Sequence, residues 1–283
     1  MFPIIYDFGI IKIFGLEFHL VIYSFGFILV LAFYSCYFFL NYDLKRLGYD
    51  EKLASDIVFW AAVGGIFGAK LYYLIENFDR VITDPKGMIF SGSGLVFLGG
   101  LLGGLIAVTI LLKKQNLSWL LFADLVAPVL ILGSCIGRIG CFLVGDDYGL
   151  PSKLPWAVSF IDGLPPTTTQ SFQYYYPWID LSGFEPGLIT VHPTQIYEVI
   201  ITFILFVFLW KKRKNIETTG NLFFIYLILY GIERFMIEFL RTNPKYLFSF
   251  FSGAQIICII MIMIGVYFYL NPVQNSASNK NSK

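Results

Sequence analysis

The chain is poor in charged residues and in regularly spaced cysteines, and each shortage excludes a class of protein. Only 14% of its 283 residues are Asp, Glu, Lys or Arg, against about 25% in a soluble domain. The formal net charge of +1 gives no indication of a nucleic-acid partner, and we expect none. The four cysteines, at positions 36, 135, 141 and 258, have no paired spacing, which argues against a disulfide framework or a zinc site.

Targeting and cofactor motifs are also missing. Residues 1–18 lack a basic segment and a small-residue cleavage site, so we expect them to be retained chain and not a signal peptide. The sequence contains no nucleotide, metal or redox cofactor motif, and we therefore expect no cofactor and no metal site.

Apolar residues are abundant instead. The chain is 57% hydrophobic and 19% aromatic, with a mean hydropathy of +0.71. These values predict an all-α, polytopic membrane protein, because a bilayer span needs roughly 20 apolar residues. Seven apolar runs are long enough, at about 19–40, 54–76, 94–113, 119–137, 192–210, 220–241 and 252–270.

Lysine and arginine orient these runs. The loops after the first, third and fifth runs carry most of them: Lys45, Arg46 and Lys52, then Lys113 and Lys114, then the four basic residues 211–214. The positive-inside rule then places the N-terminus outside and the C-terminus in the cytoplasm. We expect a single transmembrane catalytic domain over 1–274, a small extracytoplasmic cap at 144–191, and a disordered cytoplasmic tail at 275–283.

The stretch 137–149, Gly-Arg-Ile-Gly-Cys-Phe-Leu-Val-Gly-Asp-Asp-Tyr-Gly, places Arg138 at the end of an apolar run. An unpaired arginine in a membrane costs about 2.5–3.5 kcal/mol on insertion scales. An anionic lipid headgroup would offset this cost. The alternative is an arginine that snorkels to the interface beside a polar turn.

Charged residues also interrupt the sixth run. Tyr230, Arg234, Glu238 and Arg241 would lie on a helical stripe about 80° wide. Arg234 and Arg241 can each pair with Glu238, and two arginines facing one glutamate leave a positive excess. Such charges usually mark a substrate path, although a structural ion-pair ladder is the alternative. Glu233 lies off this stripe.

Two further patterns concern helix ends and helix packing. The fifth run opens with His-Pro-Thr-Gln-Ile-Tyr-Glu at 192–198; Pro193 suits a first helical turn, and Gln195 and Glu198 face the same way. His192 is either a cap or a catalytic group. Small-residue faces that favour close helix packing are formed by Gly64, Gly65 and Gly68, and by Gly99, Gly100, Gly103 and Gly104.

Taken together, these motifs resemble the prolipoprotein diacylglyceryl transferase family. The match includes the stretch 137–149, the run 192–198 and the run 231–241, with weaker matches at 94–104 and 68–73. The resemblance implies a bacterial inner-membrane enzyme that moves the diacylglyceryl group of phosphatidylglycerol onto the lipobox cysteine of a prolipoprotein signal peptide. The products are a thioether and glycerol phosphate.

The resemblance also assigns roles to residues. Arg138 and Arg234 would bind the phosphate. Our own hypothesis is that the two arginines also acidify the thiol, with Asp146 or His192 assisting. Further substrate-binding residues would be Gly149, Gln195, Glu198, Tyr230, Glu238 and Arg241. The chain departs from the family pattern at Leu98, where a histidine proposed as the base is expected, and at Cys141, Val144 and Asp146.

Two other functions are compatible with the sequence. A paralogue of the family would transfer the same group to a different acceptor. A membrane transporter could use the same charged helices, but it predicts inverted repeats, which the sequence does not show.

Overall fold

The structure is a computed structural model that describes residues 2–13, 16–90, 94, 96–216, 218–246 and 250–272. Its internal contacts divide the chain into two compact units. One unit combines Met1–Tyr34 with Val126–Lys283, and the other is Ser35–Leu125. The single catalytic domain expected over 1–274 stays a prediction. The predicted tail at 275–283 lies outside the described residues.

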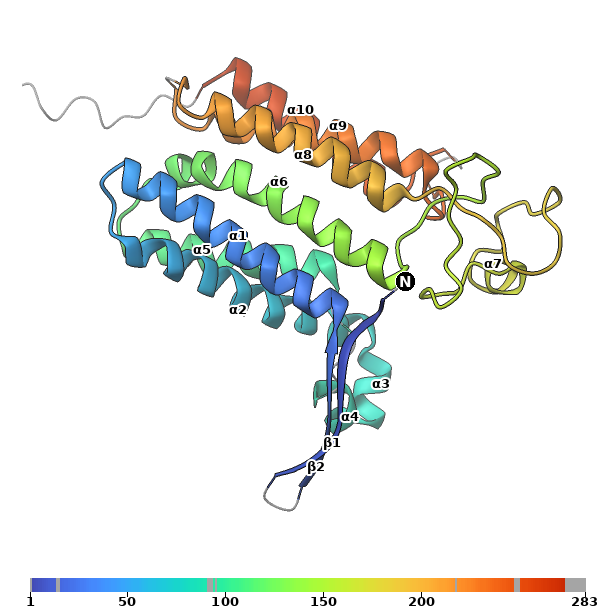
Figure 1. Ribbon diagram of the computed structural model, residues 1–283. Coiled ribbons are helices and arrows are strands. Elements are labelled where there is room, and N and C mark those ends of the chain that lie inside the picture. The colour runs from blue at the N-terminus through green and yellow to red at the C-terminus, as the bar shows by residue number, and fades with distance from the viewer. Residues whose placement is uncertain are drawn as a thin grey trace, which may run out of the picture. The chain divides into compact units, whose positions relative to one another are not determined.

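Helices make up most of the described chain (Figure 1). The elements are β1 (Ile4–Ile13), β2 (Leu16–Tyr23), α1 (Ser24–Arg46), α2 (Glu51–Glu76), α3 (Phe78–Thr83), α4 (Pro85–Phe90), α5 (Phe97–Lys114), α6 (Trp119–Val144), α7 (Thr169–Tyr175), α8 (Thr194–Lys212), α9 (Asn221–Ile237), η1 (Glu238–Leu240) and α10 (Gly253–Leu270). A helix lies in each of the seven apolar runs. Five of them, α1, α2, α6, α8 and α10, are long and apolar enough to cross a membrane.

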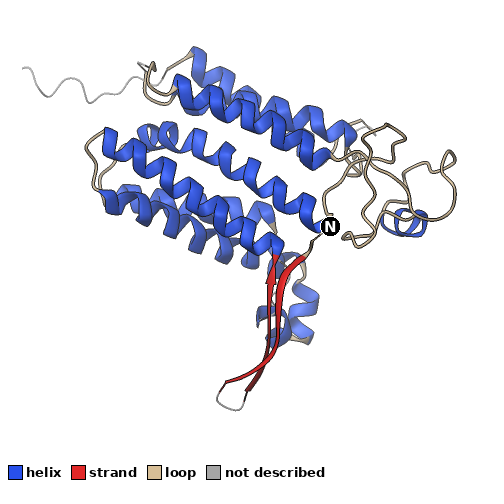
Figure 2. Cartoon of the chain, in the orientation of Figure 1, coloured by secondary structure: helices blue, strands red, loops and turns tan. Residues whose placement is uncertain are grey.

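The all-α expectation is wrong for the first part of the chain. β1 and β2 form an antiparallel hairpin, shown in red in Figure 2, and α1 begins only at Ser24. The first apolar run, predicted to span the membrane from about residue 19, therefore begins as the end of strand β2. β1 contains five isoleucines, and β2 contains one valine, one isoleucine, one phenylalanine and one tyrosine; such β-branched and aromatic residues fit a pleated strand. Short apolar runs do not distinguish a strand from a helix by periodicity alone.

Within the unit Ser35–Leu125, α2 and α5 pack through their glycines, as predicted. A Cβ atom on Gly64 would lie 2.6 Å from the carbonyl oxygen of Gly103, and one on Gly68 would lie 2.8 Å from the Cα of Gly103. A Cβ on Gly103 would in turn collide with the carbonyl oxygen of Gly64. The two backbones are therefore in direct contact, which only glycine permits at these positions.

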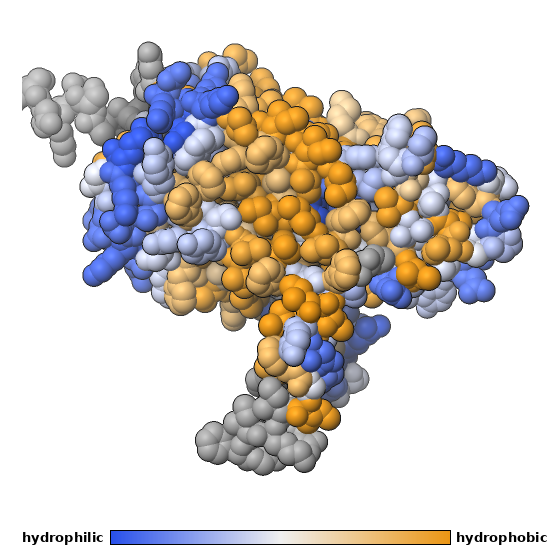
Figure 3. All heavy atoms as spheres, viewed as in Figure 1, coloured by the Kyte–Doolittle hydropathy of each residue, from blue (hydrophilic) through white to orange (hydrophobic). Residues whose placement is uncertain are grey.

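Within the other unit, α9 and α10 pack in the same manner. A Cβ on Gly265 would lie 2.9 Å from the carbonyl oxygen of Phe224, and one on Gly231 would lie 2.8 Å from Ile262. Large apolar side chains remain exposed on the outer faces of the helices, such as Ile204 on α8 (61%) and Met263 on α10 (57%). Hydrophobic residues cover the flanks of the helices in Figure 3, as a lipid-facing surface requires.

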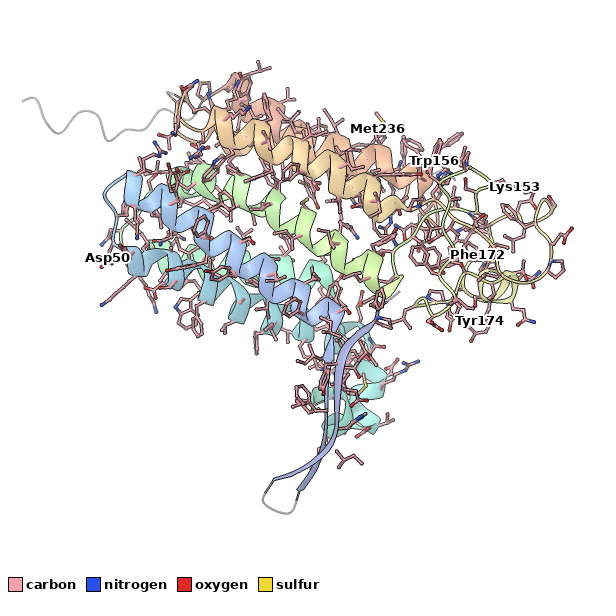
Figure 4. The ribbon with its side chains drawn as sticks, viewed as in Figure 1. Asp50, Lys153, Trp156, Phe172, Tyr174 and Met236 are labelled. Atoms are coloured by element: carbon pink, nitrogen blue, oxygen red, sulfur yellow. The ribbon has the colours of Figure 1, made fainter. Side chains whose placement is uncertain are left out.

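The residues between α6 and α8 form an inserted segment, residues 145–193, with a small core of its own. Its buried members are Tyr148, Phe160, Phe172, Ile189 and Val191. The Tyr148 ring stacks on Phe160 and Phe172 at centroid distances of 5.6 and 5.8 Å. Figure 4 marks Phe172 at the centre of the segment and the exposed Tyr174 at its edge. This core fixes the chain where it leaves α6 and where it enters α8.

The glycine contact between α2 and α5 makes a stability prediction. Gly68→Ala is expected to lower the melting temperature of the detergent-solubilised protein relative to Gly65→Ala, because its new methyl group would collide with the Gly99 carbonyl oxygen. At Gly65 the nearest atom lies at 3.5 Å, an ordinary contact. Both changes gain the same helix propensity, about 1 kcal/mol, and overpacking costs about 1–3 kcal/mol. Equal melting temperatures for the two variants would contradict the packing described.

Candidate active site

Arg138 lies near the end of α6 and is held by two carboxylates. Its Nη1 donates to Asp147 Oδ2 at 2.7 Å, and its Nε lies 2.7 Å from Glu198 Oε2 on α8. The Arg138 side chain is 17% exposed and that of Glu198 is 2% exposed. The guanidinium is thus fixed by acids from two other parts of the chain, unlike that of an arginine reaching freely into solvent.

The turn after α6 brings Asp147 back to Arg138. Gly145 and Asp147 both have left-handed backbone conformations, with φ of 76° and 58°. Glycine and aspartate are among the residues that tolerate this region. The reversal places the Asp147 carboxylate between two guanidinium groups, because Arg241 Nη2 also donates to Asp147 Oδ1. The sequence motif pointed to Asp146, but Asp147 is the acid that pairs with both arginines.

Arg241 reaches this site because it is not helical. α9 ends at Ile237, a 3-10 turn follows, and Arg241 has extended backbone angles (φ −91°, ψ 159°). The predicted helical stripe therefore stops before Arg241. The extended backbone pairs with Gly149, while Arg241 Nη1 lies 3.5 Å from Glu198 Oε1.

Gly149 permits the close approach of these two chains. A Cβ atom at Gly149 would lie 2.5 Å from the Leu240 carbonyl oxygen and 2.7 Å from Thr194 Cγ2. The adjacent amide of Leu150 donates to the same Leu240 carbonyl oxygen at 2.7 Å. Gly149 thus has a clear structural role, which is to let the segment after η1 cross the turn after α6.

The predicted pair of Arg234 and Glu238 is present, with Arg234 Nη2 and Glu238 Oε2 at 2.7 Å. Glu238 is also held through Oε1, which accepts from Asn243 Nδ2 and Ser252 Oγ, each at 2.7 Å. Arg234 Nη1 is buried and has no hydrogen-bond partner among the described residues. One charged donor of this arginine therefore remains free for a ligand.

These ion pairs join into one arginine–carboxylate network. Arg241 connects its two ends, since its Nε also lies 3.9 Å from Glu238 Oε2. The members are Arg138, Arg234, Arg241, Asp147, Glu198 and Glu238. Three acids balance three arginines, so the positive excess predicted for the sixth run is wrong. The two further acids, Glu198 on α8 and Asp147 in the turn after α6, lie far from the sixth run in sequence, so the spacing within that run does not predict them.

The remaining predicted residues surround this network. Tyr230 OH lies 3.3 Å from Ser134 Oγ on α6, and Gln195 Nε2 donates to the Asp146 carbonyl oxygen at 2.6 Å. His192 Nδ1 lies 3.4 Å from Tyr197 OH, which also accepts from Trp156 Nε1 at 2.7 Å.

The two adjacent aspartates titrate in opposite directions. Burial alone would raise the pKa of Asp147, but Arg241 and Arg138 lower it to about 2. Burial raises the pKa of Asp146, and the neighbouring Asp147 charge raises it further. Burial lowers the pKa of His192, so its imidazole is neutral at neutral pH and can accept a proton.

One group of side chains in the described part of the chain has donor atoms close enough to share a metal ion. Oxygen and sulfur atoms of Cys141, Asp146 and Asp147 lie within 4.8 Å of one another. Asp147 already binds two guanidinium groups, whose positive charges oppose a cation there. We therefore assign no metal to this group.

Comparison with known proteins agrees with the motifs. A family model described as prolipoprotein diacylglyceryl transferase matches residues 12–271. The chain belongs to this family. Among curated members named phosphatidylglycerol–prolipoprotein diacylglyceryl transferase, that of Clostridium tetani is 36% identical over 259 residues, covering 91% of this chain and 94% of its own length.

Further relatives carry the same name. The Oceanobacillus iheyensis protein is 31% identical, covering 89% of this chain and 84% of its own length. A protein of Shewanella sp. strain ANA-3 is 30% identical, and the match covers 95% of this chain and 95% of the relative's own length. The likeness therefore includes both compact units of this family member.

The opposite behaviour of the two aspartates is testable. Asp147→Asn should lower the melting temperature at pH 7 by about 2–6 °C, because it removes charged hydrogen bonds to two arginines. Since the pKa of Asp147 is lowered, its contribution is present above about pH 4 and is lost as the pH falls towards 2. The difference in melting temperature between Asp147→Asn and the parent protein should therefore shrink as the pH falls from about 4 towards 2.

Asp146→Asn is the matched control. Because burial disfavours the Asp146 charge, the neutral amide should leave the melting temperature at pH 7 unchanged or raise it. A larger loss in the Asp146 variant than in the Asp147 variant would contradict the described geometry.

Proposed function

We propose that this protein transfers the diacylglyceryl group of phosphatidylglycerol to the lipobox cysteine thiol of prolipoproteins, forming a thioether and releasing glycerol phosphate. Its membership of the family and the names of its relatives support this activity. They do not favour a transporter or a paralogue with another acceptor.

One observation in the structure supports the proposal: three arginines are held together at one place, and Arg234 Nη1 has no hydrogen-bond partner in the part of the chain that the structure describes. The donor lipid is a phosphodiester anion, which guanidinium groups bind through charge-assisted hydrogen bonds. Arg138 and Arg234 would hold its phosphate. Glu198, Glu238, Asp147 and Arg241 would keep these two guanidinium groups in position.

The chemistry explains why permanent positive charge is needed. The thiol sulfur attacks the glyceryl carbon, a carbon–sulfur bond forms, and the carbon–oxygen bond to the phosphate breaks. The electron pair of that bond stays on the phosphate oxygen, so the departing phosphate gains negative charge. Preorganised guanidinium donors stabilise this developing charge in a low-dielectric site.

The thiol proton must also leave, since the thiolate is the nucleophile. With Leu98 in place of the histidine expected from the family, the acceptor comes from another part of the chain. We propose that the arginines lower the pKa of the incoming thiol and that Asp146 or His192 takes the proton. The raised pKa of Asp146 makes its carboxylate a stronger base, whereas the lowered pKa of His192 keeps its imidazole unprotonated and able to accept a proton.

The proposed setting is the bacterial cytoplasmic membrane, crossed seven times, with the N-terminus outside and the C-terminus in the cytoplasm. The distribution of lysine and arginine supports this orientation. The inserted segment would then be an extracytoplasmic cap beside the network, where the signal peptide and phosphatidylglycerol meet.

Substitution of the phosphate-binding arginines tests the proposal. Arg138→Ala and Arg234→Ala should each lower transfer from phosphatidylglycerol to a lipobox peptide by about 10²–10³-fold or more, since each removes stabilisation of the departing phosphate. Arg80→Ala on α3 is the matched control: Arg80 is exposed and lies outside the network, and its loss should leave the rate unchanged. Transfer at the parent rate by either network variant would refute the assignment.

A further inference from the structure

The hairpin of β1 and β2 leaves large apolar side chains exposed. Tyr6 and Phe8 on β1, and Leu20 and Ile22 on β2, are between 38% and 57% exposed. A two-stranded hairpin on its own is at best marginally stable in water. Exposed apolar patches usually mark a surface that binds a partner, so the question is what covers this one.

The strand pairing places these four side chains on one face. Tyr6 pairs with Ile22, and Leu20 shares their face because residues two apart in a strand point the same way. Phe8 lies there too, since its ring contacts the Tyr6 ring at a centroid distance of 4.6 Å. We call Tyr6, Phe8, Leu20 and Ile22 the apolar face of the hairpin.

The opposite face of the hairpin carries its polar groups. Asp7 pairs with Val21 on this face, and Ile10 pairs with His19. The Oδ1 atom of Asp7 lies 2.9 Å from His19 Nε2. Among side chains 2–10 and 19–23, Asp7 and His19 are the only carboxylate and imidazole groups. The described part of the hairpin is therefore amphipathic.

The base of the hairpin is fixed at the ends of two helices that are long and apolar enough to cross a membrane, α1 and α6. The Ser24 amide, at the start of α1, donates to the Pro3 carbonyl oxygen at 3.0 Å. The Phe2 amide donates to the Leu143 carbonyl oxygen in the last turn of α6 at 3.2 Å. Phe25, in the first turn of α1, is exposed as well. The apolar surface of the hairpin thus continues the lipid-facing surface of a helix.

We propose that the apolar face of the hairpin docks on the lipid bilayer, at the membrane surface where α1 begins and α6 ends. The Asp7–His19 pair then faces water and the lipid headgroups. An apolar face beneath a polar one is how amphipathic elements lie in a membrane interface, and aromatic side chains favour this depth. Water and headgroups at this depth can satisfy the open strand edges, which the hydrocarbon core cannot do.

The position of the base also explains why lipid is the partner. Because the hairpin is held at the ends of two spans, lipid is always within its reach. Another protein chain would have to displace that lipid before it could cover the same face. Hydrophobic residues are visible on the hairpin in Figure 3.

Photocrosslinking in proteoliposomes identifies what covers the apolar face. The full-length protein is reconstituted in vesicles of phosphatidylglycerol and phosphatidylcholine. In three separate variants, p-benzoylphenylalanine replaces Leu20, His19 or Glu185, and the covalent adducts are identified by mass spectrometry. Leu20 lies on the apolar face, His19 is its neighbour on the opposite face, and Glu185 is an exposed residue of the inserted segment.

Lipid adducts at position 20 should exceed those at positions 19 and 185 by on the order of tenfold, because burial of one large apolar side chain shifts partitioning by about that factor or more. Leu20 is exposed, so its replacement should leave the fold intact. Should that variant fail to fold, replacement of Phe8 tests the same face.

Three results would overturn the proposal. Equal lipid adducts at positions 19 and 20 would contradict the orientation of the hairpin. A yield at position 20 as low as that at position 185 would show that the apolar face lies in water. Crosslinked dimers in place of lipid adducts at position 20 would show that a second copy of the chain covers it.

Discussion

The charge of the half-buried Arg138 guanidinium group is the constraint on which the site depends. A charge in or beside a hydrocarbon phase is stable only when it is paired, and Arg138 takes its partners from α8 and from the turn after α6. Both partners, Glu198 and Asp147, also contact Arg241. Removing one acid would therefore disturb two arginines, and this shared dependence fixes the distances between them.

This network explains the local features of the backbone around it. The left-handed conformation of Asp147, the end of the helix before Arg241 and the close packing at Gly149 all bring charged groups from distant segments together. The aromatic core of the inserted segment, with Tyr148 immediately after Asp147, anchors the turn. In the proposed mechanism this rigidity keeps the arginines in place while charge develops on the phosphate.

Much of this organisation could be predicted from the sequence, and the rest depends on tertiary contacts. Apolar runs indicate where helices lie, glycine spacing predicts that α2 and α5 pack closely against other helices, and the i, i+4 spacing of Arg234 and Glu238 predicts their pair. Which helices pack together is not contained in the glycine spacing. The local sequence pattern does not predict where the chain reverses direction. It does not distinguish Asp147 from Asp146, and it predicts a helix through Arg241 although α9 ends at Ile237. It also failed for the hairpin of β1 and β2, because short apolar runs fit both a strand and a helix.

The central claim is that fixed arginines receive the lipid phosphate, and a structure determined in nanodiscs of phosphatidylglycerol tests it most directly. The account predicts phosphate oxygens about 2.7–3.2 Å from guanidinium nitrogens of Arg138 and Arg234. Asp147 and Glu198 should still bridge Arg138 and Arg241. A headgroup phosphate bound elsewhere, with Arg234 Nη1 still without a partner, would contradict it.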